Sequence, residues 1–292
     1  MRRTLSLNLP VLAQDEFLME LNAAKMVGQA TQQIILRGSY LTELGQEHDI
    51  SAALAHASAQ RITYMPDTQI PISKAKYSQA VTYVHNQTAL TVAHARQKRG
   101  YRVAILNFTN PLDHGGGWLQ GVQSQEASLA RSSGLMHCLA NHPWYHQRSH
   151  QFNPFYDDTV IVVPHVPVFR SHEGDLLEVP VHHTIISTAA VHANDVRLYM
   201  PHRAAEIPLQ MARRATRVIE AAAKANANVL ILGAWGAGEF GHTPALIATA
   251  FQVALESLAT RAFAIIDFAV PDIAPNTPVY SHFHHRFHEQ SV

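Results

Sequence analysis

One stretch of the chain, from Arg102 to Leu139, constrains the fold more than any other. It begins with four apolar residues, 103–106, a run typical of a buried strand. Three consecutive glycines follow at 115–117, and a glycine backbone can adopt positive φ and let a ligand approach closely. Ser124 then stands where a helix N-cap is expected. A strand, a glycine loop and a helix start, in this order, expose backbone N–H groups to a ligand that is often anionic.

A second glycine-rich loop has the same context. The apolar run 229–232 precedes Gly236, Gly238 and Gly241, which match the pattern G-x-G-x-x-G, and a helical pattern follows. Such a loop can hold a diphosphate at a helix N-terminus, although a tight turn without a ligand has the same pattern. Asp267 ends the next apolar run, where a dinucleotide-binding fold places its ribose-binding acid. Too few residues follow Asp267 for the remaining strands of that fold.

Apolar periodicity gives the expected order of elements. We expect helices at 15–36 (one or two), 80–98, 125–140, 208–225 and 244–259, and strands at 103–107, 159–163 continuing through 166–170, 176–181, 184–190, 228–234 and 262–270. Residues 41–75 and 141–158 are expected to form loops and short elements. The alternation of strands and helices in the second half indicates an α/β fold. Both glycine loops would lie at the carboxyl edge of the sheet and could clamp an extended, phosphate-bearing ligand.

The composition favours a small-molecule site over a general macromolecular surface. The 292 residues carry 22 Lys and Arg against 22 Asp and Glu, and the balance argues against general binding of nucleic acids or membrane surfaces. The single cysteine, Cys138, is expected to be a buried small hydrophobe, and it excludes an intrachain disulfide framework. There is no signal-peptide pattern and no long apolar run, so we expect a cytoplasmic protein.

Histidine is abundant, with 20 residues in the chain. Four of them, His282, His284, His285 and His288, gather near the C-terminus, but no cysteine-containing ligand set accompanies them. We therefore predict no metal site and no cofactor. The sequence indicates a solvated, His-rich tail whose charge responds to pH.

Several segments, in order along the chain, resemble the microbial type of poly(ADP-ribose) glycohydrolase, a macrodomain-fold family. They are residues 36–40, 107–108, 115–117, 125–126, 129–133, 166–170 and 233–240. The resemblance implies a three-layer α/β/α macrodomain with a mixed central sheet. We expect a mainly helical N-terminal extension at 1–100 that packs on the core, the macrodomain core at 101–272 and the His-rich tail at 273–292.

The resemblance also implies a binding site for ADP-ribose. Gly115, Gly116 and Gly117 would lie near the distal ribose and the diphosphate. Asn107 would face the ligand from the strand end, and Gln125 belongs to the same motif. The diphosphate loop would comprise Gly236, Ala237, Gly238, Glu239 and Phe240, with Phe240 against the distal ribose.

The chain departs from the family pattern at the catalytic position. The family has Gln-Glu-Glu after the glycines and the second glutamate is credited with catalysis, whereas this chain has Ala127, which cannot donate a proton. The Asn-Pro pair common before the glycines is replaced by Asp113 and His114. Glycosidic cleavage normally needs a carboxyl acid or base. Asp113 and Glu126 are the candidates, although adjacent helical residues point about 100° apart.

These observations favour an ADP-ribosyl glycohydrolase that removes ADP-ribose from a modified macromolecule, protein or nucleic acid, with Asp113 or Glu126 as acid or base. Ala127 favours a second hypothesis, a non-catalytic ADP-ribose reader. A weaker third hypothesis is a dinucleotide-dependent enzyme that uses the loop from Gly236 to Gly241. Structural roles are also open at this stage: Asp113 could be a turn residue, and Glu126 could simply complement the helix dipole.

Overall fold

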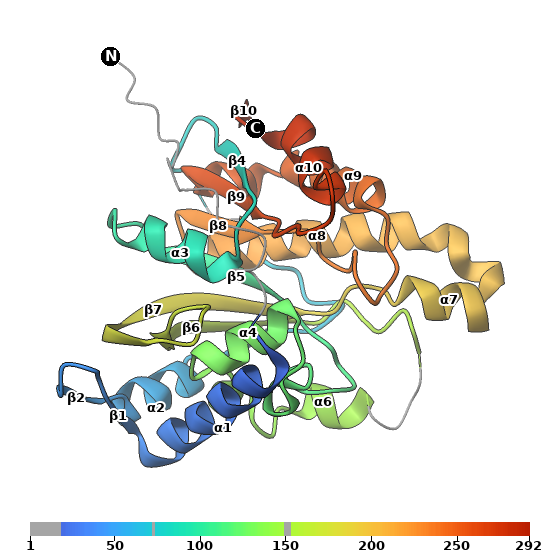
Figure 1. Cartoon of the computed structure of the whole chain (residues 1–292). Helices are drawn as coiled ribbons and strands as arrows, with labels where there is room; N and C mark the ends of the chain where they lie inside the picture. Colours follow the sequence, from blue (N-terminus) through green and yellow to red (C-terminus); the bar gives the residue numbers. More distant parts are fainter. Residues whose placement is uncertain (1–18, 72–73, 149–152) are drawn as a thin grey trace.

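The computed structural model describes residues 19–71, 74–148 and 153–292 and is built on an eight-stranded sheet (Figure 1). The strand order is β10-β4-β9-β8-β5-β7-β6-β3. Strands β4, β9, β8, β5 and β7 run parallel to one another, whereas β10, β6 and β3 pair antiparallel with their neighbours. The strands are β3 (Ile62–Tyr64), β4 (Val81–His85), β5 (Val103–Phe108), β6 (Val160–Arg170), β7 (Leu176–Thr188), β8 (Val229–Leu232), β9 (Ile265–Ala269) and β10 (Gln290–Ser291).

Helices cover both faces of the sheet, which confirms the expected three-layer α/β/α arrangement with a mixed sheet. One face packs against α8 (Ile207–Lys224), α9 (Pro244–Leu255) and α10 (Pro278–Phe287). The other packs against α3 (Ala89–Gln97), α4 (Gln125–Ser132) and α5 (Leu135–Leu139). Further helices are α6 (Pro143–Arg148), α7 (Ala193–Tyr199) and the 3₁₀ segments η2 (Trp118–Gln120), η3 (Pro201–Glu206) and η4 (Leu258–Ala262).

The central strand β5 divides its side chains between the two cores. Val103 and Ile105 pack with α3, α4 and α5, whereas Ala104 and Leu106 pack with α8 and α9. Because side chains alternate along a strand, an uninterrupted apolar run is what a strand with both faces covered requires. The strand therefore ends at its polar residue Asn107 and at Phe108, at the edge of the sheet that carries the first glycine loop.

The N-terminal part consists of α1 (Leu21–Arg37), the hairpin β1 (Ser39–Leu41) and β2 (Glu47–Asp49), and α2 (Ser51–Ala59). Residues 15–18 of the first expected helix lie outside the described residues. Thr31 joins α1 to the core: its hydroxyl donates to the Arg131 carbonyl at 2.6 Å and accepts from Arg170 Nε at 2.9 Å. The central sheet also takes strands from 62–64, 81–85 and 290–291, so its edges do not coincide with the expected divisions at 100 and 272.

Two expected elements were wrong. Residues 80–98 do not form one helix: Val81–His85 is the strand β4, and α3 begins only after Thr88, whose hydroxyl caps it by accepting from Thr91 N. The tail is not a solvated segment, because α10 buries Phe283 and Phe287 against the sheet and β10 pairs with β4. The alternation of Val81, Tyr83 and His85 and the i,i+4 pair of phenylalanines are the signals that were missed.

Three smaller differences concern boundaries. The helix expected at 125–140 is two helices, since Ser133 forms a bridge to Val168 and interrupts it. The expected loop 141–158 contains α6, and the two strands expected between 176 and 190 are the single strand β7. Cys138 is buried as expected.

None of the helices in the described ranges is long and apolar enough to cross a membrane. Within 19–71, 74–148 and 153–292, no three or more His, Cys, Asp or Glu side chains are grouped so that they could hold a metal ion.

Candidate active site

The start of α4 is fixed to the end of β5 by Gln125. Its Oε1 accepts a hydrogen bond from the Phe108 N–H at 2.9 Å, and its Nε2 donates to the Leu106 carbonyl at 2.7 Å. The Gln125 side-chain amide thus makes the two hydrogen bonds that a neighbouring strand would otherwise make with these backbone groups. The Ser124 hydroxyl accepts from the Ala127 N–H at 3.1 Å, so the predicted N-cap is confirmed. Strand end and helix start therefore form one rigid unit.

The three glycines between these elements all adopt the left-handed conformation, with φ of +85°, +57° and +71°. A Cβ at Gly115 would lie 2.5 Å from Trp118 Cδ1, and a Cβ at Gly117 would lie 2.5 Å from Val122 Cγ2. Both backbone conformation and space therefore require glycine here.

Glu126 lies beneath this loop and is only 1% exposed. Its Oε1 accepts from Asn107 Nδ2 at 3.2 Å and its Oε2 accepts from the Asn110 N–H at 2.8 Å. Burial raises the pKa of Glu126 to about 8, the negative charge of Asp113 adds to the rise, and the two hydrogen bonds oppose it. A Cβ at Gly116 would be 3.3 Å from Oε2, so the bare glycine backbone lies directly against the carboxyl.

Asn107 is the buried centre of this polar group. Besides Glu126, its Nδ2 donates to Thr109 Oγ1 at 2.9 Å and to Ser187 Oγ at 3.1 Å. The side chain is fully buried and is enclosed by these partners. Its contact with a ligand therefore stays a prediction.

Sequence reasoning did not single out Tyr145, which the short helix α6 brings to the same group. The side chain is buried, and burial, followed by the charge of Glu126, raises its pKa well above the ordinary value. The His114 ring packs on the Tyr145 ring with centroids 4.2 Å apart. Since this segment was expected to be a loop, nothing in the sequence indicated which of its aromatic residues turns inward.

Asp113 and Ala127 differ in exposure to solvent. Asp113 is exposed, and its Oδ2 is 3.5 Å from where a Cβ of Gly117 would be. Its carbonyl accepts from the Gly116 N–H at 2.8 Å, so it also has the turn role considered above. Ala127 is completely buried in the core that includes Leu129. The two predicted carboxyls thus both lie close to the triglycine loop, Glu126 at Gly116 and Asp113 at Gly117.

The second glycine loop is held by α7. Asn194 Nδ2 donates to the Glu239 carbonyl at 3.1 Å, and the Asn194 N–H donates to the Phe240 carbonyl at 3.2 Å. Arg197 Nη1 donates to the Gly241 carbonyl at 3.0 Å. Gly236 and Gly241 have φ of +85° and +75°, whereas a Cβ at Gly238 would meet nothing within 4 Å. The loop backbone is therefore fixed and leaves space next to Gly238.

A cavity of about 380 Å³ lies between the start of α4 and the second glycine loop. It is bordered by Phe108 at the end of β5, by Ser124 and Gln125 at the start of α4, and by Ala237 and Gly238. The end of β9 with residues 269–273 and the start of α3 with residues 88–90 form further parts of its wall. Because β8 and β5 are parallel neighbours, their loops meet at one edge. Of the predicted site residues, Gln125, Ala237 and Gly238 line this cavity, whereas the triglycine loop, Glu126, Glu239 and Phe240 do not.

The acid expected for a dinucleotide site is not available to a ligand. Asp267 is completely buried, receives two hydrogen bonds from Arg96, each at 2.7 Å, and contacts His85 Nε2 at 2.8 Å. After β9 the chain forms α10 and the short antiparallel edge strand β10, rather than further parallel strands. These arrangements contradict a role for Asp267 in binding a dinucleotide ribose.

Comparison with known proteins agrees with this geometry. The family model "microbial-type PARG, catalytic domain" matches residues 28–171. Poly(ADP-ribose) glycohydrolase from Thermomonospora curvata is 32% identical with a TM-score of 0.84, over 91% of this chain and 100% of that one. The structure of this glycohydrolase bound to the inhibitor ADP-HPD is 33% identical, with the same coverage and a TM-score of 0.81.

The glycohydrolase from Deinococcus radiodurans in complex with ADP-ribose is 31% identical, with a TM-score of 0.74, over 80% of this chain and 96% of that one. The comparison with curated proteins found no match. With these identities and this coverage, the chain belongs to the microbial-type poly(ADP-ribose) glycohydrolase family.

Proposed function

We propose that this protein is an ADP-ribosyl glycohydrolase that binds ADP-ribose between its two glycine loops and releases it from a modified macromolecule. The family member from Thermomonospora curvata has been solved with the inhibitor ADP-HPD, and the one from Deinococcus radiodurans with ADP-ribose. The cavity of about 380 Å³ between the start of α4 and the second glycine loop has a size suited to such a ligand. The space next to Gly238 allows a diphosphate to approach the loop backbone closely.

The reaction breaks a glycosidic bond through an oxocarbenium-like state, which calls for an acid at the leaving group and a base at the attacking water. Two carboxyl groups with unlike surroundings suit these two roles. We assign Glu126 as the acid and Asp113 as the base. The observation that carries this assignment is the buried carboxyl of Glu126, whose pKa is raised to about 8 beside the charge of Asp113. A carboxyl group with this pKa is largely protonated at pH 7 and has a proton to donate.

The triglycine loop has a direct part in this assignment. The bare backbone of Gly116 lies against the Glu126 carboxyl, and the exposed Asp113 lies close to Gly117 in the same loop. A ribose that packs against this loop therefore comes close to both groups without an intervening side chain. In this assignment Glu126 and Asp113 take the role that the second glutamate of the family motif would have at position 127.

A non-catalytic ADP-ribose reader is the second candidate, and two observations favour it. Ala127 has no proton to donate, and Glu126 is not part of the cavity wall. A reader would use the same cavity and the same diphosphate loop. The two functions therefore differ in whether ADP-ribose is released, and not in where it binds.

The test is to incubate the protein with poly(ADP-ribose), with mono-ADP-ribosylated protein and with ADP-ribosylated nucleic acid, and to measure free ADP-ribose. Wild type is expected to release ADP-ribose from at least one substrate. Asp113→Asn and Glu126→Gln are expected to slow that release while still binding ADP-ribose. A wild-type protein that binds ADP-ribose and releases none from any substrate would establish the reader instead.

The proposal also names the class of macromolecule to which the ADP-ribose is attached. The balanced charge of the chain gives no strong attraction to a nucleic-acid backbone, so we propose a protein carrier. Faster release from the nucleic-acid substrate than from the protein substrate would contradict this choice and leave the glycohydrolase itself intact.

A further inference from the structure

Tyr156 holds an unusual backbone conformation close to the second glycine loop. Its φ is +53°, a left-handed value that bulky residues rarely adopt, and only 7% of the residue is exposed. A non-glycine residue in this region costs of the order of 1–3 kcal/mol and persists only where its surroundings impose it. Residues held in such conformations cluster at ligand-binding and active sites.

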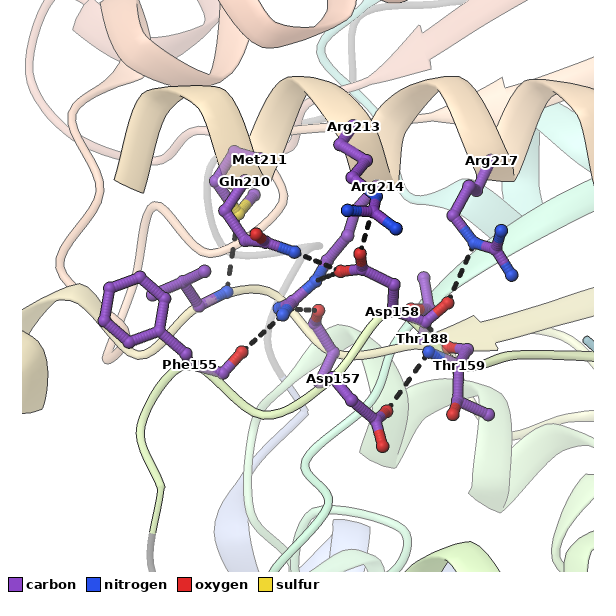
Figure 2. Close-up of polar contacts among 12 residues, drawn as sticks. Phe155, Asp157, Asp158, Thr159, Thr188, Gln210, Met211, Arg213, Arg214 and Arg217 are labelled. Carbon is purple, nitrogen blue, oxygen red and sulfur yellow. Dashed lines mark hydrogen bonds and ion pairs between the residues drawn. The ribbon is translucent and has the colours of Figure 1, made fainter. Parts of the chain in front are cut away.

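The surroundings that impose this conformation come from α8 (Figure 2). Arg214 Nε donates to Asp158 Oδ1 at 2.8 Å, its Nη1 donates to the Ala189 carbonyl at 3.0 Å, and its Nη2 donates to the Phe155 carbonyl. Arg217 Nε donates to the Asp158 carbonyl at 2.9 Å. Arg214 thus binds the chain directly before Tyr156 and two residues after it. The tyrosine is fixed from both sides by one helix.

The held side chain faces the loop proposed to bind the diphosphate. The centroids of the Tyr156 and Phe240 rings are 6.2 Å apart with an interplanar angle of 38°. The Phe240 ring also packs against the His192 ring, with ring centroids 4.4 Å apart. Tyr156 and Phe240 are 84 positions apart in sequence (240 − 156), so this pairing comes from the fold alone. Together they form one aromatic surface at the end of the glycine loop.

The hydroxyl of Tyr156 has a distinctive environment. Burial raises the pKa of Tyr156 to about 12, and the negative charges of Asp195 and Glu239 add to the rise. Arg214 has a smaller, opposing effect. Within the described ranges the hydroxyl makes no hydrogen bond to another residue, and it is not one of the fully enclosed polar atoms, so solvent reaches it. The hydroxyl is therefore a protonated donor that a ligand group can reach by displacing solvent.

We propose, resting on the function proposed above, that Tyr156 contacts the distal ribose of ADP-ribose, with its hydroxyl donating to a ribose hydroxyl and its ring extending the surface of Phe240. A phosphate group fits this position less well, because the carboxylates of Asp195 and Glu239 would repel it. A neutral polyol next to an aromatic surface fits both the charge and the shape of the site. Tyr156 is thus a residue for recognising the sugar that distinguishes ADP-ribose from ADP.

The experiment compares two ligands and two variants by calorimetry. Tyr156→Phe removes only the hydroxyl and keeps the ring and backbone. We expect it to weaken ADP-ribose binding roughly 2- to 10-fold, the effect of one lost neutral hydrogen bond, and to leave ADP binding unchanged. Tyr199→Phe, at a tyrosine that is 62% exposed on α7, is the matched control and should leave both affinities unchanged. Thermal unfolding of Tyr156→Phe should match wild type, because Tyr156 loses no protein hydrogen bond.

Two results would overturn the inference while leaving the proposed function standing. Unchanged ADP-ribose affinity in Tyr156→Phe would show that the hydroxyl does not contact the ligand. An equal loss for ADP and ADP-ribose would place Tyr156 at the diphosphate or give it a merely structural role. A different result, wild type that binds ADP-ribose no better than ADP, would count against the proposed function itself.

Discussion

Asn107 Nδ2 donates to Glu126 Oε1 at 3.2 Å in the interior of the protein, beneath the triglycine loop. The two residues are 19 positions apart, one at the end of β5 and the other in the first turn of α4. This bond links the strand to the proposed catalytic carboxyl. Because a side-chain amide has no charge, the bond holds Glu126 in place without fully offsetting the effect of burial on its pKa.

The pKa of Glu126 predicts how stability depends on pH. A carboxyl raised from 4.5 to about 8 by folding binds its proton more tightly in the folded state. The stability that this tighter proton binding gives the folded state is therefore fully present below about pH 4.5 and is lost as the pH rises through 8. We expect wild type to lose up to a few kcal/mol more than Glu126→Gln between pH 5.5 and pH 8.5 in urea unfolding. Parallel pH profiles for the two proteins would contradict the raised pKa.

The close contact of Gly116 with Glu126 can be separated from backbone strain. Gly116→Ala places a Cβ 3.3 Å from Glu126 Oε2 and 3.1 Å from Ser124 Oγ, at a φ of +57°. Gly100→Ala has a φ of +83° and nothing within 4 Å, so it carries the backbone cost alone. We expect Gly100→Ala to lose roughly 1–2 kcal/mol of stability and Gly116→Ala to lose more and to weaken ADP-ribose binding. Equal losses with unchanged binding would show that the Glu126 contact is of no consequence.

The cluster in Figure 2 offers a matched pair of arginines on α8. Arg214 is 1% exposed and Arg213 is 56% exposed, yet both pair with Asp158, at 2.8 and 2.9 Å. Breaking the buried pair with Arg214→Gln should cost about 3–5 kcal/mol. Arg213→Gln should cost less than about 1 kcal/mol, because an exposed pair is screened by solvent. Urea unfolding measures both, and similar losses for the two variants would contradict the account of this cluster.

Asp267 is predicted to act on stability and not on ligand binding. Burial alone would raise its pKa, but the hydrogen bonds from His85 and Arg96 lower it overall. Asp267→Asn leaves Arg96 as a buried charge without its anion, so we expect a loss of several kcal/mol. Folded Asp267→Asn should bind ADP-ribose within about twofold of wild type, since no ligand contact is lost. Calorimetry below the unfolding transition is the check; a larger loss of affinity would reopen the dinucleotide hypothesis.

The elements that sequence reasoning identified correctly are those with a local signal. The apolar run at 103–106, the three glycines and Ser124 each express their structure within a few residues, so β5, the glycine loop and the start of α4 followed directly. The histidines near the C-terminus had the opposite effect. Their polarity suggested a solvated tail and concealed the apolar pair Phe283 and Phe287, which places α10 on the sheet.

Other features could not be read from the sequence, because they join distant segments. Asp158 and Arg214 are 56 positions apart, and nothing near either residue indicates the other. The same holds for Tyr156 against Phe240 and for Tyr145 beside Glu126. The burial of Glu126 and the raised pKa that follows from it also depend on how α4, the glycine loop and β5 pack together, and this is a property of the fold.

The most direct test is a comparison of single-turnover release of ADP-ribose at pH 7 by wild type and by Glu126→Gln, on whichever substrate wild type cleaves. Loss of a general acid should reduce the rate by about 10²- to 10⁴-fold, while ADP-ribose affinity changes only severalfold. The rate for wild type should also fall above about pH 8, where Glu126 loses its proton. A Glu126→Gln protein that releases ADP-ribose as fast as wild type would contradict the assignment of Glu126 as the acid.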